Sequence, residues 1–230
     1  MRLDELRTNL DVVRRRIAAA TDAAGRTDEV GLVVVTKFFP ASDVRLLADL
    51  GVTDVGENRH QEAEVKAAEC ADLGLRWHFI GGLQSNKAAA VASYADVVET
   101  LDRPKLVAPL SRGAQARSGE VDVLLQVSLD APGADHRAGA DRSALSDLAH
   151  RVDEADGLHL RGLMAVAPLG EDPAMAFGRL AELRTVFLAE HPAATTLSAG
   201  MSGDLETAIA HGATHVRVGS AVLGPRRPVQ

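Results

Sequence analysis

Short apolar runs alternate with longer helical segments along the whole chain, and this alternation limits the folds that the chain can adopt. The apolar runs read as buried strands, and alanine- and leucine-rich segments of helical period follow most of them. Eight strand runs in 230 residues predict a closed (β/α)8 barrel rather than an open sheet. We expect one barrel domain over residues 1–230, with an extra N-terminal helix at Leu3–Ala24. The predicted strands are Gly31–Lys37, Asp54–Asn58, His78–Gly81, Val97–Thr100, Val123–Leu129, Arg161–Val166, Thr196–Ala199 and His215–Val218.

Composition and charge argue against nucleic-acid and membrane partners. Hydrophobic residues make up 46% of the chain, which is enough to bury a sizeable core. The net charge of −7 leaves no basic stripe for a phosphate backbone, and the run Arg14–Arg16 reads as a solvated helix face. The N-terminus is too charged for a signal peptide, and no apolar run approaches the roughly 20 residues that span a membrane. We therefore expect a cytoplasmic protein.

Polar residues gather where the predicted strands end. In a (β/α)8 barrel the functional groups lie at the carboxyl ends of the strands, so these residues are candidates for a site. The last strand closes against the first, which should bring Arg217, Gly219 and Ser220 close to Lys37. The strand-end groups are Thr36–Lys37, Gly56–Asn58, Gly81–Lys87, Ser198–Gly203 and Arg217–Ser220.

Lys37 stands at the end of the apolar run VGLVVVTKFFP, where burying a charge costs free energy. A free lysine amine titrates near ~10.4, so few molecules carry the neutral nucleophile at neutral pH unless desolvation lowers the pKa. A strand-end lysine in an apolar rim is suited to a Schiff base with an aldehyde. The alternative is a lysine that snorkels or forms an ion pair at the edge of the core.

The loops after the last two strands contain two pairs of small residues, Ser202–Gly203 and Gly219–Ser220. Such loops often hold a phosphate in this architecture, because small residues let backbone N–H groups approach an anion. Ser202 also has a structural interpretation as the cap of a helix over Asp204–Ala210. Two such pairs beside a strand-end lysine favour a phosphate site.

Five segments resemble, in order and spacing, the family of pyridoxal phosphate homeostasis proteins, also called proline-synthase co-transcribed proteins. They are VVTKFFP, GENRHQEA, WHFIGGLQSNK, GLMAVAP and LSAGMSGDLETAIAHGATHVRVGSAVLG, and the resemblance runs from Leu3 to Gly224. It implies a barrel similar to the N-terminal domain of alanine racemase, called fold type III. It further implies that Lys37 carries pyridoxal 5'-phosphate (PLP) as an internal aldimine. Ser202, Gly219 and Ser220 would hold the phosphate, Arg217 would face the pyridine nitrogen, and Asn58 would lie beside the ring.

The expected role of Arg217 has a chemical consequence. A guanidinium stays protonated, so it can only donate a hydrogen bond to the pyridine nitrogen, which leaves the ring neutral. A neutral ring is a weaker electron sink than a protonated one, and aminotransferase chemistry is disfavoured. The alternative for Arg217 is an arginine inside the barrel that pairs with a carboxylate.

The chain departs from the common pattern of the family at several positions. Arg59–His60 replaces the tyrosine-containing form of the GEN motif, and Phe38–Phe39 stands where members often carry a second lysine. A role for that tyrosine or that second lysine is therefore not expected here. Ala199 replaces a methionine, which should only alter packing. The stretch Asp130–Asp141 reads as a surface loop, with a lid over the site as the alternative.

The histidines and the cysteine read as structural. His211 and His215 are four residues apart, but Gly212 breaks the helix between them, so no metal site is predicted. His78 reads as a histidine at the edge of the core, with a place beside the cofactor as the alternative. Cys70 is the single cysteine and allows no internal disulfide.

Three functions remain open from the residues. The resemblance implies a non-catalytic protein that buffers PLP and exchanges it with PLP-dependent apoenzymes. The second is a weak amino-acid racemase, and the third is a class I aldolase whose lysine attacks a sugar phosphate. The single tyrosine, Tyr94, falls in the approach to the predicted strand Val97–Thr100, and no second acid for two-sided proton transfer is evident, so we favour the first function. No dimer surface is evident, and a monomer is expected.

Overall fold

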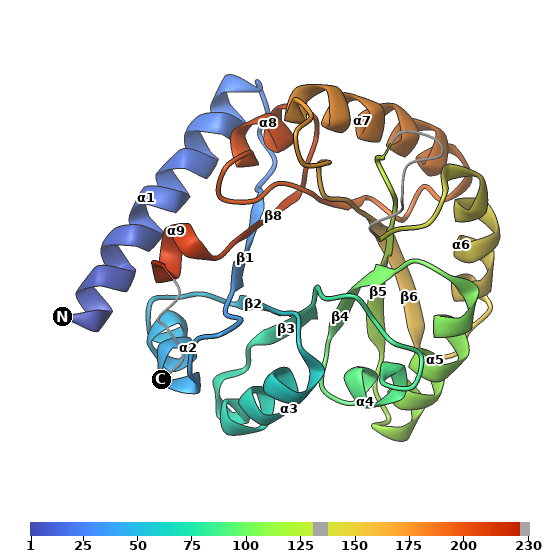
Figure 1. Cartoon of the computed structure of the whole chain (residues 1–230), viewed down its shortest axis with the longest axis horizontal. Helices are drawn as coiled ribbons and strands as arrows, with labels where there is room; N and C mark the ends of the chain where they lie inside the picture. Colours follow the sequence, from blue (N-terminus) through green and yellow to red (C-terminus); the bar gives the residue numbers. More distant parts are fainter. Residues whose placement is uncertain (131–137, 226–230) are drawn as a thin grey trace.

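The computed structural model describes residues 1–130 and 138–225, and within them eight parallel strands close into a barrel (Figure 1). The predicted (β/α)8 fold is confirmed. Each strand pairs with its sequence neighbours, and the last strand pairs with the first. The strands are β1 Gly31–Val35, β2 Asp54–Glu57, β3 Arg76–Phe79, β4 Val97–Leu101, β5 Val121–Gln126, β6 Leu158–Met164, β7 Thr196–Ser198 and β8 His215–Val218.

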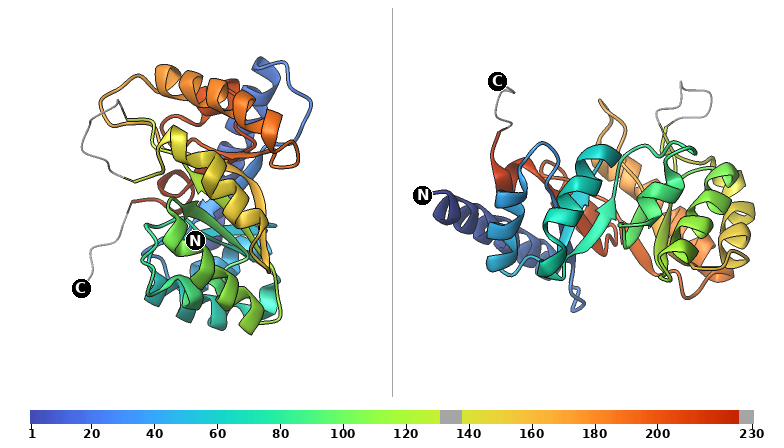
Figure 2. Two further views of the ribbon diagram at one scale, coloured as in Figure 1. Left: turned by 90° about the vertical axis from the view of Figure 1, so that its right-hand side faces the viewer. Right: turned by 90° about the horizontal axis from the view of Figure 1, so that it is seen from below.

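Helices surround the strands on the outside of the barrel, as the side views in Figure 2 show. They pack by amphipathic faces, because each strand of a barrel needs cover on its outer side. The α-helices are α1 Arg2–Ala23, α2 Ala41–Asp49, α3 His60–Glu69, α4 Ala88–Ala92, α5 Val107–Ala116, α6 Leu145–Asp153, α7 Pro173–Glu190, α8 Leu205–Ala210 and α9 Ser220–Leu223. Short 3-10 turns lie at Ala71–Leu73, Pro104–Leu106 and Arg142–Ala144.

Several strand ends differ from the prediction. The register of β1 on β2 ends at the pair Val35 and Gly56, and the chain then turns, so Lys37 lies two residues beyond the strand. β2 ends at Glu57, one residue before Asn58. β5 and β6 begin and end two to three residues earlier than predicted. The shifts at β1 and β2 place Lys37 and Asn58 in the loops at one mouth of the barrel.

The extra helix α1 packs across the closure of the barrel, against α8 and α9 (Figure 1). Its buried residues Leu6, Leu10, Val13 and Ile17 recur every three to four positions, which places them on one face. Burying one such side chain contributes roughly 1.5–3 kcal/mol to folding. The run Arg14–Arg16 lies on the solvated side of α1 as expected, with Arg14 and Arg15 exposed and Arg16 half-buried, and Arg14 and Arg16 also donate to backbone carbonyls of other segments.

Two sequence expectations concern the remaining segments. The expectation for the Asp130–Asp141 loop, a surface loop or a lid, falls largely on residues 131–137, which lie outside the described residues. Within the described ranges, no helix combines the length and hydropathy that a membrane crossing needs.

Candidate functional site

A pocket of about 300 Å³ opens at the carboxyl ends of β1, β7 and β8. This volume is at the lower end of the range for small-ligand sites. It contains Lys37, Ser202, Arg217, Gly219 and Ser220, so the structure brings together five of the six residues predicted from the sequence. The remaining lining is mainly apolar: Val35, Phe38, Phe39, Ile80, Met201, Gly203 and Gly224.

Lys37 is half-buried in a tight turn between β1 and α2. The turn closes through a hydrogen bond from the Phe39 amide to the Thr36 carbonyl, at 3.1 Å. Phe38 has a φ of 70°, a conformation that non-glycine residues adopt rarely. Its backbone amide donates to Glu62 Oε1 at 2.6 Å. The backbone on both sides of Lys37 is therefore held in place.

Lys66 on α3 is the most buried lysine described, with 4% of its surface exposed. Its amine donates to Thr36 O at 2.9 Å, Glu57 Oε1 at 2.5 Å and Glu62 Oε1 at 3.1 Å. Thr36 Oγ1 also donates to Glu57 Oε1, at 2.6 Å. We name Thr36, Glu57, Glu62 and Lys66 the turn cluster. Burial raises the pKa of Glu57 and outweighs the opposing effects of Lys66 and Thr36.

The sequence pattern did not predict the turn cluster, because it indicated Lys37 as the lysine at the edge of the core. Lys66 is not among the predicted site residues, yet it is buried on α3 against the ends of β1 and β2. The four-residue spacing of Glu62 and Lys66 on one helix face is the signal that could have indicated the pair. Its burial depends on how α3 packs, which the spacing does not show.

Ser202 and Ser220 come from adjacent loops and meet at the pocket, where their hydroxyl oxygens lie 3.5 Å apart. Gly219 comes so close to β1 that a side-chain Cβ there would lie 3.2 Å from Val35 O. The interpretation of Ser202 as a helix cap was wrong, because α8 begins at Leu205 and Asp204 is its cap residue. Ser202 instead lies free of the helix, in the loop that lines the pocket.

Helix α1 holds both of these loops by their backbone carbonyls. Arg16 Nη2 donates to Ser202 O at 3.0 Å, and Arg16 also pairs with Glu206. Asn9 Nδ2 donates to Val222 O at 3.0 Å, at the end of the short helix α9. The extra N-terminal helix therefore helps to position the Ser202 and Ser220 loops.

Arg217 lies at the floor of the pocket, with 4% of its surface exposed. Its Nη1 donates to Ser198 Oγ at 2.6 Å, and its Nη2 donates to Ala165 O at 2.9 Å. Glu99 Oε2 lies 3.6 Å from Nη1. Burial lowers the pKa of Arg217, and the carboxylates of Glu99 and Asp204 oppose that shift. Arg217 thus pairs with an interior carboxylate and also lines the pocket.

Asn58 and Tyr94 lie outside the lining of this pocket. Asn58 follows β2, and its Oδ1 is buried without a hydrogen-bond partner. Tyr94 follows α4 and stacks on His60, with ring centroids 5.9 Å apart. Burial, with smaller contributions from Glu57 and Glu64, raises the pKa of Tyr94. Tyr94 is therefore neither at the pocket nor easily ionised.

The chain is similar to known proteins over nearly its whole length. The profile of the family described as "Alanine racemase, N-terminal domain" matches residues 1–227. The pyridoxal phosphate homeostasis protein of Mycobacterium tuberculosis H37Rv is 45% identical, over 98% of this chain and 95% of the relative. The chain belongs to the pyridoxal phosphate homeostasis protein family. The member from Escherichia coli K12 is 36% identical, over 97% of this chain and 98% of its own length.

A solved structure agrees with this assignment to the family. PipY of Synechococcus elongatus PCC7942, determined with PLP bound, superposes with a TM-score of 0.81 at 33% identity. The match covers 95% of this chain and 100% of that one. The resemblance that the sequence motifs indicated is confirmed.

Two departures from the family pattern meet in the structure. The guanidinium of Arg59 lies over the ring of Phe38, 4.7 Å from its centroid. Phe38 is 36% exposed and lines the pocket. The arginine that replaces the family's tyrosine therefore contacts the phenylalanine that follows Lys37, at the rim of the pocket.

The structure places His78, His211 and His215 where the sequence predicted. His78 is buried with 4% of its surface exposed and contacts two carboxylates, so it is a core histidine as expected. α8 ends at Ala210, and Gly212 has a φ of 92°, so His211 and His215 do not share a helix face. Among the described residues, no group of three or more His, Cys, Asp or Glu is arranged to hold a metal ion.

Proposed function

We propose that this protein binds PLP in the pocket at the barrel mouth and serves in PLP homeostasis without catalytic turnover. The observation that carries the proposal is the convergence of Lys37, Arg217 and the Ser202 and Ser220 hydroxyls on one small pocket. When bound, PLP supplies an aldehyde, an electron-withdrawing ring and a phosphate. The family name and PLP-bound PipY support the same ligand.

Lys37 is the residue that would hold the cofactor covalently. Its Nζ would attack the aldehyde carbon, and the oxygen would leave as water as the carbon–nitrogen double bond forms. The turn cluster holds Thr36 and Phe38 on either side by hydrogen bonds. This arrangement supports a fixed direction for the lysine side chain, because its own backbone has little freedom.

Ser202, Gly219 and Ser220 would bind the phosphate. In this architecture the loops after the seventh and eighth strands, with the start of a short extra helix, often form a phosphate site. Here that helix is α9, which begins at Ser220. Gly219 leaves room for the backbone to approach, because any side chain there would crowd Val35.

Arg217 and Asn58 would flank the ring. Arg217 lines the pocket and donates hydrogen bonds to Ser198 Oγ and Ala165 O. It remains a donor toward the pyridine nitrogen, which leaves the ring neutral. Asn58 Oδ1, buried and unpartnered, is an acceptor at the end of β2.

The position of Tyr94 supports a holding role rather than racemisation. Two-sided proton transfer needs an acid opposite the lysine, and Tyr94 is the single tyrosine in the sequence. It stacks on His60 away from the pocket, and its raised pKa disfavours proton exchange at neutral pH. We further propose a cytoplasmic monomer of one domain that exchanges PLP with PLP-dependent apoenzymes.

Reduction with borohydride tests the covalent bond. The purified protein incubated with PLP should absorb visible light, and reduction followed by peptide mapping should place the adduct on Lys37. Lys37→Ala should lose the adduct and the colour. An adduct on Lys66, Lys87 or Lys105 instead would contradict the assignment, as would racemisation of amino acids that Lys37→Ala abolishes.

The phosphate contacts need a separate measurement. The double variant Ser202→Ala with Ser220→Ala should release PLP at least several-fold faster, because each lost hydrogen bond to a charged group is worth about 1.5–3 kcal/mol. Ser93→Ala, on the exposed turn after α4, is the matched control. Unchanged release in the double variant would remove the phosphate assignment.

A further inference from the structure

Five side chains from five strands form a continuous hydrogen-bonded row through the barrel interior. Arg217 Nη1 donates to Ser198 Oγ at 2.6 Å, and Ser198 Oγ donates to Glu99 Oε2 at 2.6 Å. Glu99 Oε1 lies 2.8 Å from His78 Nδ1, and His78 Nε2 lies 2.9 Å from Asp54 Oδ1. We name these five residues the axial row.

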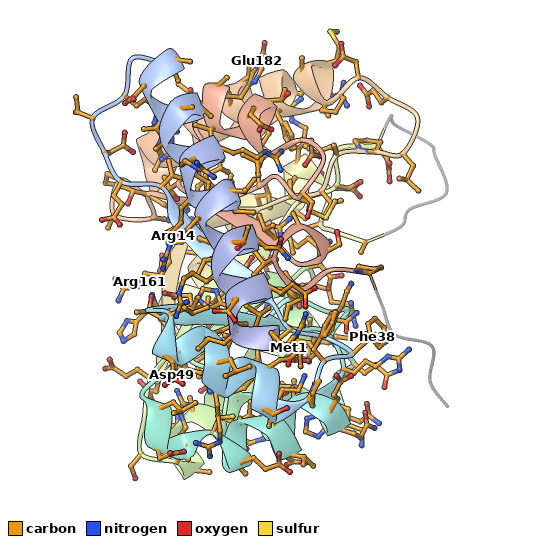
Figure 3. All side chains as sticks on the ribbon, turned by 90° about the vertical axis from the view of Figure 1, so that its left-hand side faces the viewer. Met1, Arg14, Phe38, Asp49, Arg161 and Glu182 are labelled. Carbon is orange, nitrogen blue, oxygen red and sulfur yellow. The ribbon has the colours of Figure 1, made fainter. Side chains whose placement is uncertain are left out.

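The axial row joins two pockets at opposite mouths of the barrel. Arg217 lines the cofactor pocket. Ser198, Glu99 and His78 line a second pocket of about 290 Å³, which Arg161 also lines. Figure 3 shows Phe38, from the first pocket, and Arg161, from the second, at opposite edges of the molecule. His78 can therefore exchange protons with solvent without passing the cofactor.

Glu99 stands between two cations in a nearly dry interior. Its exposed fraction is 1%, and those of His78 and Arg217 are 4% each. Burial raises the pKa of Glu99, but His78 and Arg217 outweigh it, and the net direction is downward. Burial likewise lowers the pKa of His78, but its hydrogen bonds to Asp54 and Glu99 outweigh it and raise that pKa. A carboxylate shared by two cations couples one to the other.

Few other charges compete for His78. Asp54 on β2 and Glu99 on β4 are its hydrogen-bond partners among the described residues. His215 on β8 faces the same interior, with its Nδ1 2.9 Å from Thr214 Oγ1, and its pKa is lowered, first by burial. The other charged residues that line this pocket are Arg76, Asp122 and Arg161, and both arginines pair with Asp122.

We propose that Glu99 is a positioning residue for Arg217, and that protonation of His78 at the opposite mouth changes, through Glu99, how close the charged guanidinium of Arg217 lies to the cofactor ring. With His78 charged, Glu99 is shared by two cations. With His78 neutral, the carboxylate acts on Arg217 alone and draws the guanidinium away from the pocket. The coupling is reciprocal, so a change at Arg217 must shift the titration of His78. The effect on the cofactor rests on the proposed function, whereas the link between the two side chains does not.

The first test uses the cofactor-free protein and histidine NMR. The midpoint of the His78 titration should move downward in Glu99→Gln and upward in Arg217→Met, by on the order of one pH unit. His215→Gln is the matched control, since it removes the neighbouring interior histidine without touching the row. Unmoved midpoints in Glu99→Gln and Arg217→Met, or a larger shift in His215→Gln, would overturn the proposal.

The second test follows the absorbance of bound PLP against pH. The wild type should show a step at the His78 midpoint, and His78→Gln should lack that step while keeping any titration of the cofactor itself. Asp54→Asn, a half-buried position, should move the step to lower pH. An absorbance step that persists in His78→Gln would overturn the coupling. A colourless protein would instead count against the proposed function, and the NMR measurement would still decide the link.

Discussion

The turn cluster and the axial row are both buried groups of charges, but they act on different parts of the molecule. In the turn cluster, the hydrogen bonds of Lys66 and Glu62 reach backbone atoms, Thr36 O and Phe38 N. The links that run along the axial row join side chains to side chains. The first cluster therefore fixes where the chain runs, and the second fixes how charge is distributed along the barrel axis.

This difference separates the two lysines near the site. Lys66 forms ion pairs with Glu57 and Glu62, and it is more buried than Lys37. Lys37 is half-buried at the wall of a pocket. Burial alone is thus a poor guide to the reactive lysine, because a buried lysine with well-placed acceptors is held as a cation.

The largest expected effect is on stability at Lys66. Lys66→Met should lower the free energy of unfolding by about 3–5 kcal/mol, because it leaves Glu57 buried without its cation. Lys37→Ala should change that free energy by less than about 1 kcal/mol while losing covalent PLP. Urea denaturation of the cofactor-free proteins measures both changes.

The matched control for Lys66→Met is Lys105→Met, at an exposed position. The loss in Lys66→Met should shrink toward acid pH, where Glu57, whose pKa burial already raises, becomes protonated. Equal losses in the Lys37 and Lys66 variants would erase the distinction between the two lysines.

A smaller effect should appear in the pH dependence of the axial row. The pKa of His78 is raised in the folded protein. Its contribution to stability is therefore fully present below the unfolded value near ~6.5, and it is lost as pH rises through the folded pKa. The pKa of Glu99 is lowered, so its contribution is present above the unfolded value near ~4.3 and is lost in acid.

At pH values below the titration of His78, His78→Gln should lower the free energy of unfolding by about 1–3 kcal/mol, because Glu99 loses a charged partner. The cost should decline as pH rises and the wild-type histidine becomes neutral. Free energies of unfolding measured at several pH values check this. A constant difference across the range would show that His78 contributes packing rather than charge.

The barrel and the nearness of Lys37 to Ser220 could be predicted from the sequence. Alternating strand and helix runs identify the fold, and closure then places β8 beside β1, as the pairing of Val33 with Arg217 confirms. These inferences need only periodicity and topology. They survive errors of two residues in the end of a strand.

The two charge clusters could not be predicted in the same way. Asp54, His78 and Glu99 each lie in a predicted or observed strand, but whether they meet depends on register. The observed pairing of Gly56 with His78 fixes the register of β3 on β2. A slip of one residue would turn His78 to the outer face of the barrel. Lys66 depends in addition on the rotation of α3 against the barrel, which helix periodicity leaves open.

The smallest expected effect tests the backbone contacts that α1 makes with the pocket loops. Asn9→Ala removes the hydrogen bond to Val222 O and should cost about 1 kcal/mol of unfolding free energy. Because α9 begins at Ser220, the same variant should speed PLP release by a few-fold. Arg15→Ala is the matched control, since Arg15 is exposed and bonds to Asp11 O in its own helix.

The His78 titration should not move in Asn9→Ala, because the lost contact reaches a carbonyl and leaves the charges of the axial row in place. Faster PLP release with an unmoved His78 titration would show that contacts to the backbone act on this pocket separately from the charges of the axial row. Equal release from Asn9→Ala and Arg15→Ala would show that α1 does not position the phosphate loops.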